Sequence, residues 1–156
     1  MLVGEHISRW LQEIGGFRRV ALDTNAVIYY LQVVSPYWEL VQHLFRMMER
    51  GLMVGTISTV VEAEVLVKPL HEGDQEFVDQ AGLFFRAFPN MIIRAVDRGV
   101  AQRSAMVRAQ TGLQLPDAMI VATALEERCD AIIGNDISMA AHITEIPYLL
   151  LENYLS

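Results

Sequence analysis

Short apolar runs alternate along this chain with longer segments of helical periodicity, and this alternation limits the fold more than any other feature. We expect strands at residues 18–23, 52–57, 91–96 and 131–133, with an edge strand at 147–151. We expect helices at residues 6–14, 24–32, 36–50, 59–68, 74–88, 97–111, 116–128 and 137–143. Strands separated by helices pair in parallel through right-handed crossovers. The predicted fold class is therefore α/β, with three layers and a central parallel sheet flanked by helices.

The helix ends are marked by residues that break helices. Gly51 and Gly112 follow two of the predicted helices, and Pro69 is expected to close the helix that begins at Thr59. The chain has 156 residues, 53% of them hydrophobic, which fits one compact domain with a sizeable core.

The charge balance limits the classes of partner. The sequence has 12 Lys and Arg against 19 Asp and Glu, a net charge of −7. This balance argues against a sequence-independent DNA coat or a membrane-surface binder, because both need a basic face. It leaves room for an enzyme that cuts nucleic acid, since bound metal ions can supply positive charge.

Other functions are excluded by residue counts and by the N-terminal segment. The single cysteine, Cys129, excludes an intramolecular disulfide and a zinc site built from several cysteines. The longest apolar runs are far shorter than the ~20 residues that span a bilayer. The first ten residues lack the basic start and apolar block of a signal peptide. We expect a cytoplasmic protein without membrane contact.

Two acids follow predicted strands. Asp23 closes the first strand and Asp136 follows the strand at 131–133. Ligands of open α/β sheets bind outside the carboxyl ends of strands, so both carboxylates can reach one crevice. Asp117 lies in the first turn of its helix and heads a stripe of apolar residues, which predicts burial of its face. The alternative role for Asp117 is to complement the helix dipole, worth a few tenths of a kcal/mol.

The helix that begins at Thr59 contains two more acids. Glu62 and Glu64 are two positions apart, about 200° around a helix, so they cannot serve one site together. Glu62 has the capping-box spacing from Thr59 and is expected to be a solvent-facing cap. Glu64 has valines one turn away on both sides, so we expect it within an apolar stripe. An ion pair with Lys68 is the structural alternative for Glu64.

These acids together predict a metal centre. The four candidate ligands, which would also be the catalytic residues, are Asp23, Glu64, Asp117 and Asp136. Carboxylates packed together raise each other's pKa and oppose folding unless a cation compensates. Ligands that are all oxygen favour Mg²⁺ or Mn²⁺, and such ions hold phosphates and activate water. Asn25 and Asn135 are expected to supply neutral contacts, and Thr24 to orient Asp23.

Four segments of the sequence resemble the motifs of a known protein family. They are LDTNAVIYYL at 22–31, STVVEAEVLVKPL at 58–70, LPDAMIVATAL at 115–125 and IIGND at 132–136. In order and spacing, the chain resembles the PIN-domain ribonucleases over about residues 20–151, in particular the VapC-type toxins of type II toxin–antitoxin pairs.

The resemblance implies a metal-dependent endoribonuclease that hydrolyses RNA and has a cognate antitoxin as partner. It implies one or two Mg²⁺ or Mn²⁺ ions held by Asp23, Glu64, Asp117 and Asp136. Residues 20–156 would form the nuclease domain, and residues 1–19 a variable extension packed on it. One departure is Gly134, where the family often has Ser or Thr, so a hydroxyl that could order the fourth acid is missing.

Two alternative functions remain. An aspartyl-phosphate phosphatase would need an acid where Asn25 stands, which counts against it. A non-catalytic partner-binding subunit is supported only by Gly134. We also expect a homodimer, because the apolar helix at 37–48 looks exposed and a lone domain seldom leaves large apolar patches uncovered.

Overall fold

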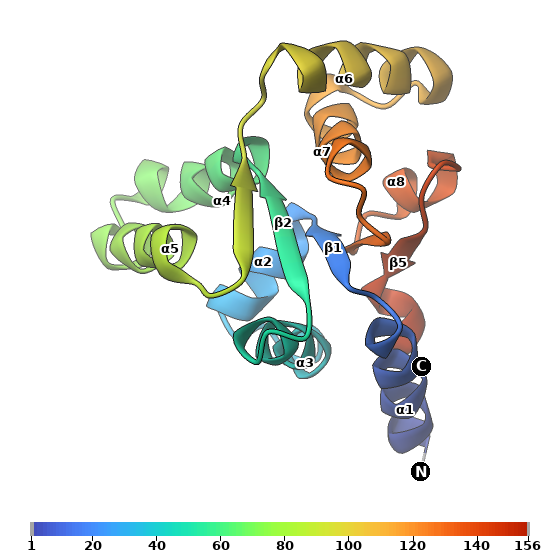
Figure 1. The fold of residues 1–156 in the computed structure, drawn as a ribbon. Helices are drawn as coiled ribbons and strands as arrows, with labels where there is room; N and C mark the ends of the chain where they lie inside the picture. The colour runs from blue at the N-terminus through green and yellow to red at the C-terminus, as the bar shows by residue number, and fades with distance from the viewer. Residues whose placement is uncertain (1, 156) are drawn as a thin grey trace.

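The apolar runs form a five-stranded sheet in the computed structural model, which describes residues 2–155 (Figure 1). The strands are β1 (Arg19–Leu22), β2 (Val54–Ser58), β3 (Met91–Arg94), β4 (Ala131–Gly134) and β5 (Tyr148–Leu150). Their order in the sheet is β3-β2-β1-β4-β5, and every neighbouring pair is parallel. The predicted α/β class with a central parallel sheet is confirmed, and β5 is an edge strand as expected.

Helices connect the strands. They are α1 (Leu2–Gly15), α2 (Thr24–Leu31), α3 (Tyr37–Glu49), α4 (Thr59–Glu72), α5 (Gln75–Ala87), α6 (Arg98–Thr111), α7 (Leu115–Glu126), α8 (Ile137–His142) and the 3₁₀ turn η1 (Leu151–Tyr154). Most of their ends lie within two residues of the predicted ones, although α1 starts earlier. Across residues 2–155, no helix combines the length and the apolar character needed to cross a membrane.

The predicted end of α4 at Pro69 is wrong. The helix continues through Pro69 for another turn and ends before Gly73, which has a left-handed backbone with φ of 71°. Proline in a helix removes one backbone hydrogen bond, but here Pro69 is buried. Gly73 adopts the left-handed conformation at little cost, so the glycine rather than the proline ends the helix.

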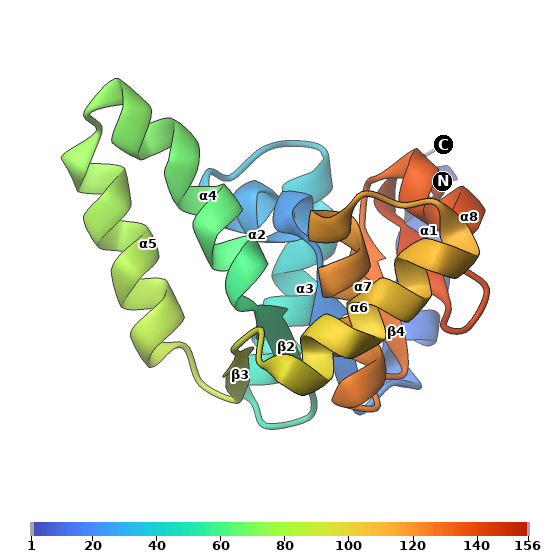
Figure 2. The same cartoon turned by 90° about the horizontal axis from the view of Figure 1, so that it is seen from above.

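The helices form two outer layers. In the view from above, α2 to α4 lie on one side of the sheet and α6 on the other, with α5 beside α4 (Figure 2). Helix α7 contacts β1, β2 and β4 and is covered in turn by α6. Residues all around α7 are buried, Ala118, Ile120, Val121 and Ala124 among them. A helix enclosed in this way is apolar on every side, which explains why α7 shows little amphipathic pattern.

The strand order places a topological switch point beside β1. The chain moves from β1 outward to β2 and β3, and then returns to β4 and β5 on the other side of β1. In the β1–β4 pair, Leu22 is the register partner of Ile133. Ligands of such sheets bind in the crevice at the carboxyl ends of the two strands that flank a switch point. The residues that follow Leu22 and Gly134 therefore line the expected ligand site.

The first helix is part of the core. Trp10 and Ile14 of α1 are fully buried, and the indole Nε1 of Trp10 donates a 2.9 Å hydrogen bond to the carbonyl of Leu40 in α3. The ring of Tyr154 meets Trp10 edge-on. Helix α1 thus joins α3 to the C-terminal turn η1.

The helix at 37–48 does not present an exposed apolar face, so the reason given for a homodimer fails. The apolar side chains of α3 are buried inside the same chain; they are Leu40, Val41, Leu44, Phe45 and Met48. Phe45 packs on Tyr30, Phe84 and Phe88 in an aromatic cluster. Intramolecular packing thus covers the surface on which the dimer prediction rested.

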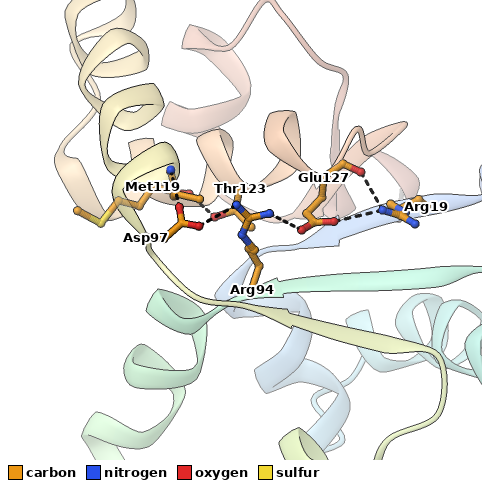
Figure 3. Close-up of polar contacts among 7 residues, drawn as sticks. Arg19, Arg94, Asp97, Met119, Thr123 and Glu127 are labelled. Atoms are coloured by element: carbon orange, nitrogen blue, oxygen red, sulfur yellow. Dashed lines mark hydrogen bonds and ion pairs between the residues drawn. The ribbon is translucent and has the colours of Figure 1, made fainter.

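A series of ion pairs connects the end of α7 to two strands (Figure 3). Glu127, at the end of α7, accepts hydrogen bonds from Arg94 of β3 at 2.7 Å and from Arg19 of β1 at 3.2 Å. Arg94 also pairs with Asp97 at 3.1 Å. These groups are partly exposed, so each ion pair contributes modestly to stability. Together the linked pairs hold the end of α7 against β1 and β3.

Candidate active site

Asp23 is the most buried of the predicted ligands. It follows β1 directly, caps the N-terminus of α2, and is only 3% exposed. Its Oδ1 accepts a 2.8 Å hydrogen bond from the backbone N–H of Thr24, and its Oδ2 accepts a 2.7 Å hydrogen bond from the hydroxyl of Tyr148. The carboxylate is thus held by one donor on each oxygen.

Asp136 follows β4 on the other side of the switch point. It caps the N-terminus of α8, where its Oδ1 accepts a 3.1 Å hydrogen bond from the N–H of Met139. The backbone N–H of Asp136 donates to the hydroxyl of Tyr148 at 3.0 Å. One tyrosine hydroxyl therefore links the backbone of Asp136 to the side chain of Asp23.

Asp117 is half-buried in the first turn of α7, at the head of the buried face that the sequence predicts. A cleft of about 300 Å³ opens beside it, between the α6–α7 connection and α8. Its lining is Thr111, Gly112, Leu113, Gln114, Asp117, Ser138 and His142. The cleft gives a polar ligand access to this acid.

Glu64 lies differently from the prediction. The buried stripe of α4 consists of Val61, Val65 and Pro69, and Glu64 is exposed beside it. Its Oε1 accepts a 2.8 Å hydrogen bond from the hydroxyl of Thr24. The hydroxyl of Thr24 thus contacts Glu64 rather than Asp23, and the contact from Thr24 to Asp23 is made by the backbone N–H.

The prediction for Glu62 is also wrong. Helix α4 is capped by Ser58, whose hydroxyl accepts a 3.1 Å hydrogen bond from the N–H of Val60, so no capping box starts at Thr59. Glu62 is half-buried, and its Oε2 is enclosed without a hydrogen-bond partner among the described residues. It lies on the other flank of the buried stripe from Glu64.

The four predicted acids influence one another electrostatically. Burial raises the pKa of Asp23 to about 6, and the charges of Asp117 and Asp136 add to the rise, against the lowering effect of its two hydrogen bonds. Burial also raises the pKa of Asp117, with further contributions from Asp136 and Glu64. Acids from four separate segments thus lie near enough to repel one another.

The two asparagines that were expected to supply neutral contacts, Asn25 and Asn135, lie in different surroundings. The side-chain amide of Asn135 donates to the hydroxyl of Tyr29 at 3.1 Å and accepts from the N–H of Glu152 at 2.9 Å. Its polar atoms therefore hold neighbouring segments in place. Asn25 is half-buried in the first turn of α2, next to Thr24.

The chemistry of this cluster fits a hard divalent cation. All candidate donors are carboxylate oxygens, and the ion pairs found within residues 2–155 leave these four acids without a Lys or Arg partner. In the same part of the chain, no three His, Cys, Asp or Glu side chains are arranged to enclose one ion. A shared cation would therefore need changes in the side-chain rotamers of the less buried acids, Glu64, Asp117 and Asp136, around the hydrogen-bonded carboxylate of Asp23.

Tyr148 is the residue of this site that the sequence did not reveal. Burial and the negative charge of Asp23 raise the pKa of Tyr148, so its hydroxyl stays protonated and can donate. The only signal in the sequence was Gly134, which lacks the hydroxyl expected at that position.

Comparisons with known proteins identify the family and the fold. A family model described as the PIN domain matches residues 20–142. No curated protein matches the sequence. A toxin–antitoxin complex from Klebsiella pneumoniae is similar in fold, with 22% identity, coverage of 85% of this chain and 97% of the other, and a TM-score of 0.59.

Two further solved structures share the fold. VapBC2 from Rickettsia felis, bound to a DNA fragment from its promoter, has 15% identity, covers 85% of this chain and 98% of its own, and gives a TM-score of 0.66. VapC20 from Mycobacterium tuberculosis, a sarcin-ricin loop cleaving toxin, has 11% identity, coverages of 82% and 98%, and a TM-score of 0.64. Since the family model spans most of the sequence, this chain belongs to the PIN-domain family.

Proposed function

We propose that this protein is a divalent-cation-dependent endoribonuclease that acts as the toxin of a toxin–antitoxin pair. The observation that supports the proposal is that Asp23 and Asp136 follow the two strands at the switch point, and that Asp117 and Glu64 lie close enough for the charges of this set to raise the pKa of Asp23 and Asp117 beyond the effect of burial. Similar folds in a toxin–antitoxin complex and in a sarcin-ricin loop cleaving toxin support the same function.

The chain's own residues would bind and orient the reactants. Asp23 keeps one orientation because both of its oxygens accept hydrogen bonds, and Thr24 holds Glu64 toward the same crevice. The four carboxylates would hold Mg²⁺ or Mn²⁺. When bound, such an ion polarises the scissile phosphate and lowers the pKa of the attacking water. The cleft beside Asp117 would admit the RNA strand.

The non-catalytic alternative is opposed by one contact at Gly134. It rested on the absence of a hydroxyl at Gly134, and the hydroxyl of Tyr148 lies 2.3 Å from where a side-chain carbon of residue 134 would begin. A hydroxyl is therefore present at this position in space, although it comes from another strand.

Cleavage of RNA by matched variants tests the proposal. Single-stranded and structured RNA are incubated with Mg²⁺ or Mn²⁺ and with wild type, Asp23→Asn or Asp74→Asn. Asp74 is a suitable control because it also caps a helix, α5, but lies outside the acid cluster. We expect wild type and Asp74→Asn to cleave and Asp23→Asn to lose at least ~100-fold in rate, since it removes a ligand of the ion. Equal cleavage by all three proteins contradicts the proposal.

The antitoxin partner is tested separately. Expression of a toxin alone should arrest the host cells, and co-expression of the small protein encoded beside it should restore growth and co-purify with it. If the neighbouring reading frame neither binds the protein nor restores growth, the toxin role is wrong even if the nuclease activity is real.

A further inference from the structure

Gly134 and Tyr148 fit together as a pair in the candidate site. A Cβ atom added to Gly134 would lie 2.3 Å from the hydroxyl oxygen of Tyr148 and 2.6 Å from the Cβ of Asp23. Both distances are shorter than any ordinary contact. The lack of a side chain at residue 134 therefore creates the space that the tyrosine hydroxyl fills.

The strand register explains how the hydroxyl reaches this space. Tyr148 is the partner of Ile132 in the β4–β5 pair. Gly134 is two positions further along β4, on the same face of the sheet as Ile132, and about 6.6 Å away. A tyrosine ring can span this distance, so the hydroxyl ends beside Gly134 at the carboxyl end of the strand.

The hydroxyl then makes two contacts with the acid cluster. It donates to Oδ2 of Asp23 at 2.7 Å and accepts from the backbone N–H of Asp136 at 3.0 Å. Asp23 follows β1 and Asp136 follows β4, so this one oxygen joins the two sides of the crevice. Asp23 is almost fully buried, and its Oδ2 depends on this donor for its orientation.

We infer that Tyr148 is a positioning residue: its hydroxyl fixes the carboxylate of Asp23 relative to Asp136, and Gly134 is the space that it requires. The inference deepens the proposed function and rests on it for the meaning of the site as a cation centre. Groups that orient metal ligands change metal affinity or activity by about 10–100-fold when they are removed.

The test compares Tyr148→Phe with Tyr154→Phe. Each change removes only a hydroxyl that donates to a carboxylate, but the hydroxyl of Tyr154 bonds to Glu13 in α1, far from the acid cluster. Mn²⁺ affinity is measured by calorimetry, and RNA cleavage is measured as separate kcat and KM values. We expect Tyr148→Phe to bind Mn²⁺ at least ~10-fold more weakly and to lose at least ~10-fold in kcat, with KM unchanged. Tyr154→Phe should match wild type in both.

A second readout separates failure of this inference from failure of the proposed function. The NMR resonance of the Asp23 carboxyl carbon, recorded without metal, should shift in Tyr148→Phe and stay in place in Tyr154→Phe. An unchanged resonance overturns the inference, as does Mn²⁺ binding and cleavage equal to wild type. If wild type itself neither binds Mn²⁺ nor cleaves RNA, the proposed function is wrong, and the NMR comparison alone decides whether Tyr148 positions Asp23.

Discussion

The hydroxyl of Thr24 donates a 2.8 Å hydrogen bond to Oε1 of Glu64, although the two residues are 40 positions apart. This contact joins the first residue of α2 to the first half of α4. Glu64 is exposed and has no buried packing to hold it, so a hydrogen bond from the residue next to Asp23 is what keeps it near the crevice.

Replacing Thr24 should therefore weaken the site. We expect Thr24→Ala to lower the rate of RNA cleavage by about 10-fold, because Glu64 is then free to turn toward solvent. Thr24→Ser keeps the hydroxyl and is the matched control, expected to retain most of the activity. Cleavage by Thr24→Ala at the wild-type rate would show that this hydrogen bond does not position Glu64.

The raised pKa of Asp23 predicts a pH-dependent cost in stability. Its pKa is about 6 in the folded protein, above the ordinary value, so between about pH 4 and pH 6 the folded state holds more protons than the unfolded state. The contribution of Asp23 to the free energy of unfolding therefore falls as pH rises through this window. At pH 7.5 and without metal, the cost reaches about 3 kcal/mol.

Asp23→Asn removes that cost. We expect the metal-free variant to be more stable than wild type to denaturant at pH 7.5, with the difference shrinking toward pH 4, where Asp23 is protonated in both states. Asp74→Asn, which replaces one good N-cap residue with another at an exposed position, should change the free energy of unfolding by less than ~1 kcal/mol at both values of pH. If the difference in the free energy of unfolding between Asp23→Asn and wild type does not change with pH, the pKa of Asp23 is not raised in the folded protein.

Substitution of Gly134 should be costly. Gly134→Ala places a Cβ against both Asp23 and the hydroxyl of Tyr148, so the strands must shift. We expect a loss of about 1–3 kcal/mol in the free energy of unfolding, together with reduced cleavage. Gly82→Ala is the control, because a Cβ there meets only the flexible end of Arg86 and alanine favours the helix α5. Equal stability of the two variants would show that the space at Gly134 is not restricted.

Helix α1 should contribute strongly to stability. We expect Trp10→Ala to lower the free energy of unfolding by about 3–5 kcal/mol, because it leaves a large cavity and removes the indole hydrogen bond to the carbonyl of Leu40. Trp38→Ala, at a half-buried tryptophan, should cost clearly less. If both variants unfold at the same denaturant concentration, α1 is only loosely attached.

The sequence predicted those parts of the fold and site that depend on local pattern. Asp23 and Asp136 are predicted as site residues because Asp23 directly follows one strand, Asp136 comes two residues after another, and parallel strands bring their carboxyl ends to one edge. Asp117 was found because the apolar residues that follow it have helical spacing, and their burial is confirmed.

The remaining features depend on orientation and on contacts between distant segments. Valines occur on several sides of α4, so periodicity alone did not show that Val61 and Val65 face the core while Glu64 faces outward. The helix also passes through Pro69, which is buried, although proline usually ends or kinks a helix. Tyr148 lies 125 positions after Asp23, and only the strand register brings its hydroxyl there.

The central claim is that the four acids share a divalent cation. Crystals of the wild-type protein, soaked in millimolar Mn²⁺ and measured at the manganese absorption edge, test it most directly. The account predicts an anomalous peak within bonding distance of carboxylate oxygens from Asp23 and at least one of Asp117, Asp136 and Glu64. Manganese peaks only elsewhere, with these carboxylates still apart, would contradict it.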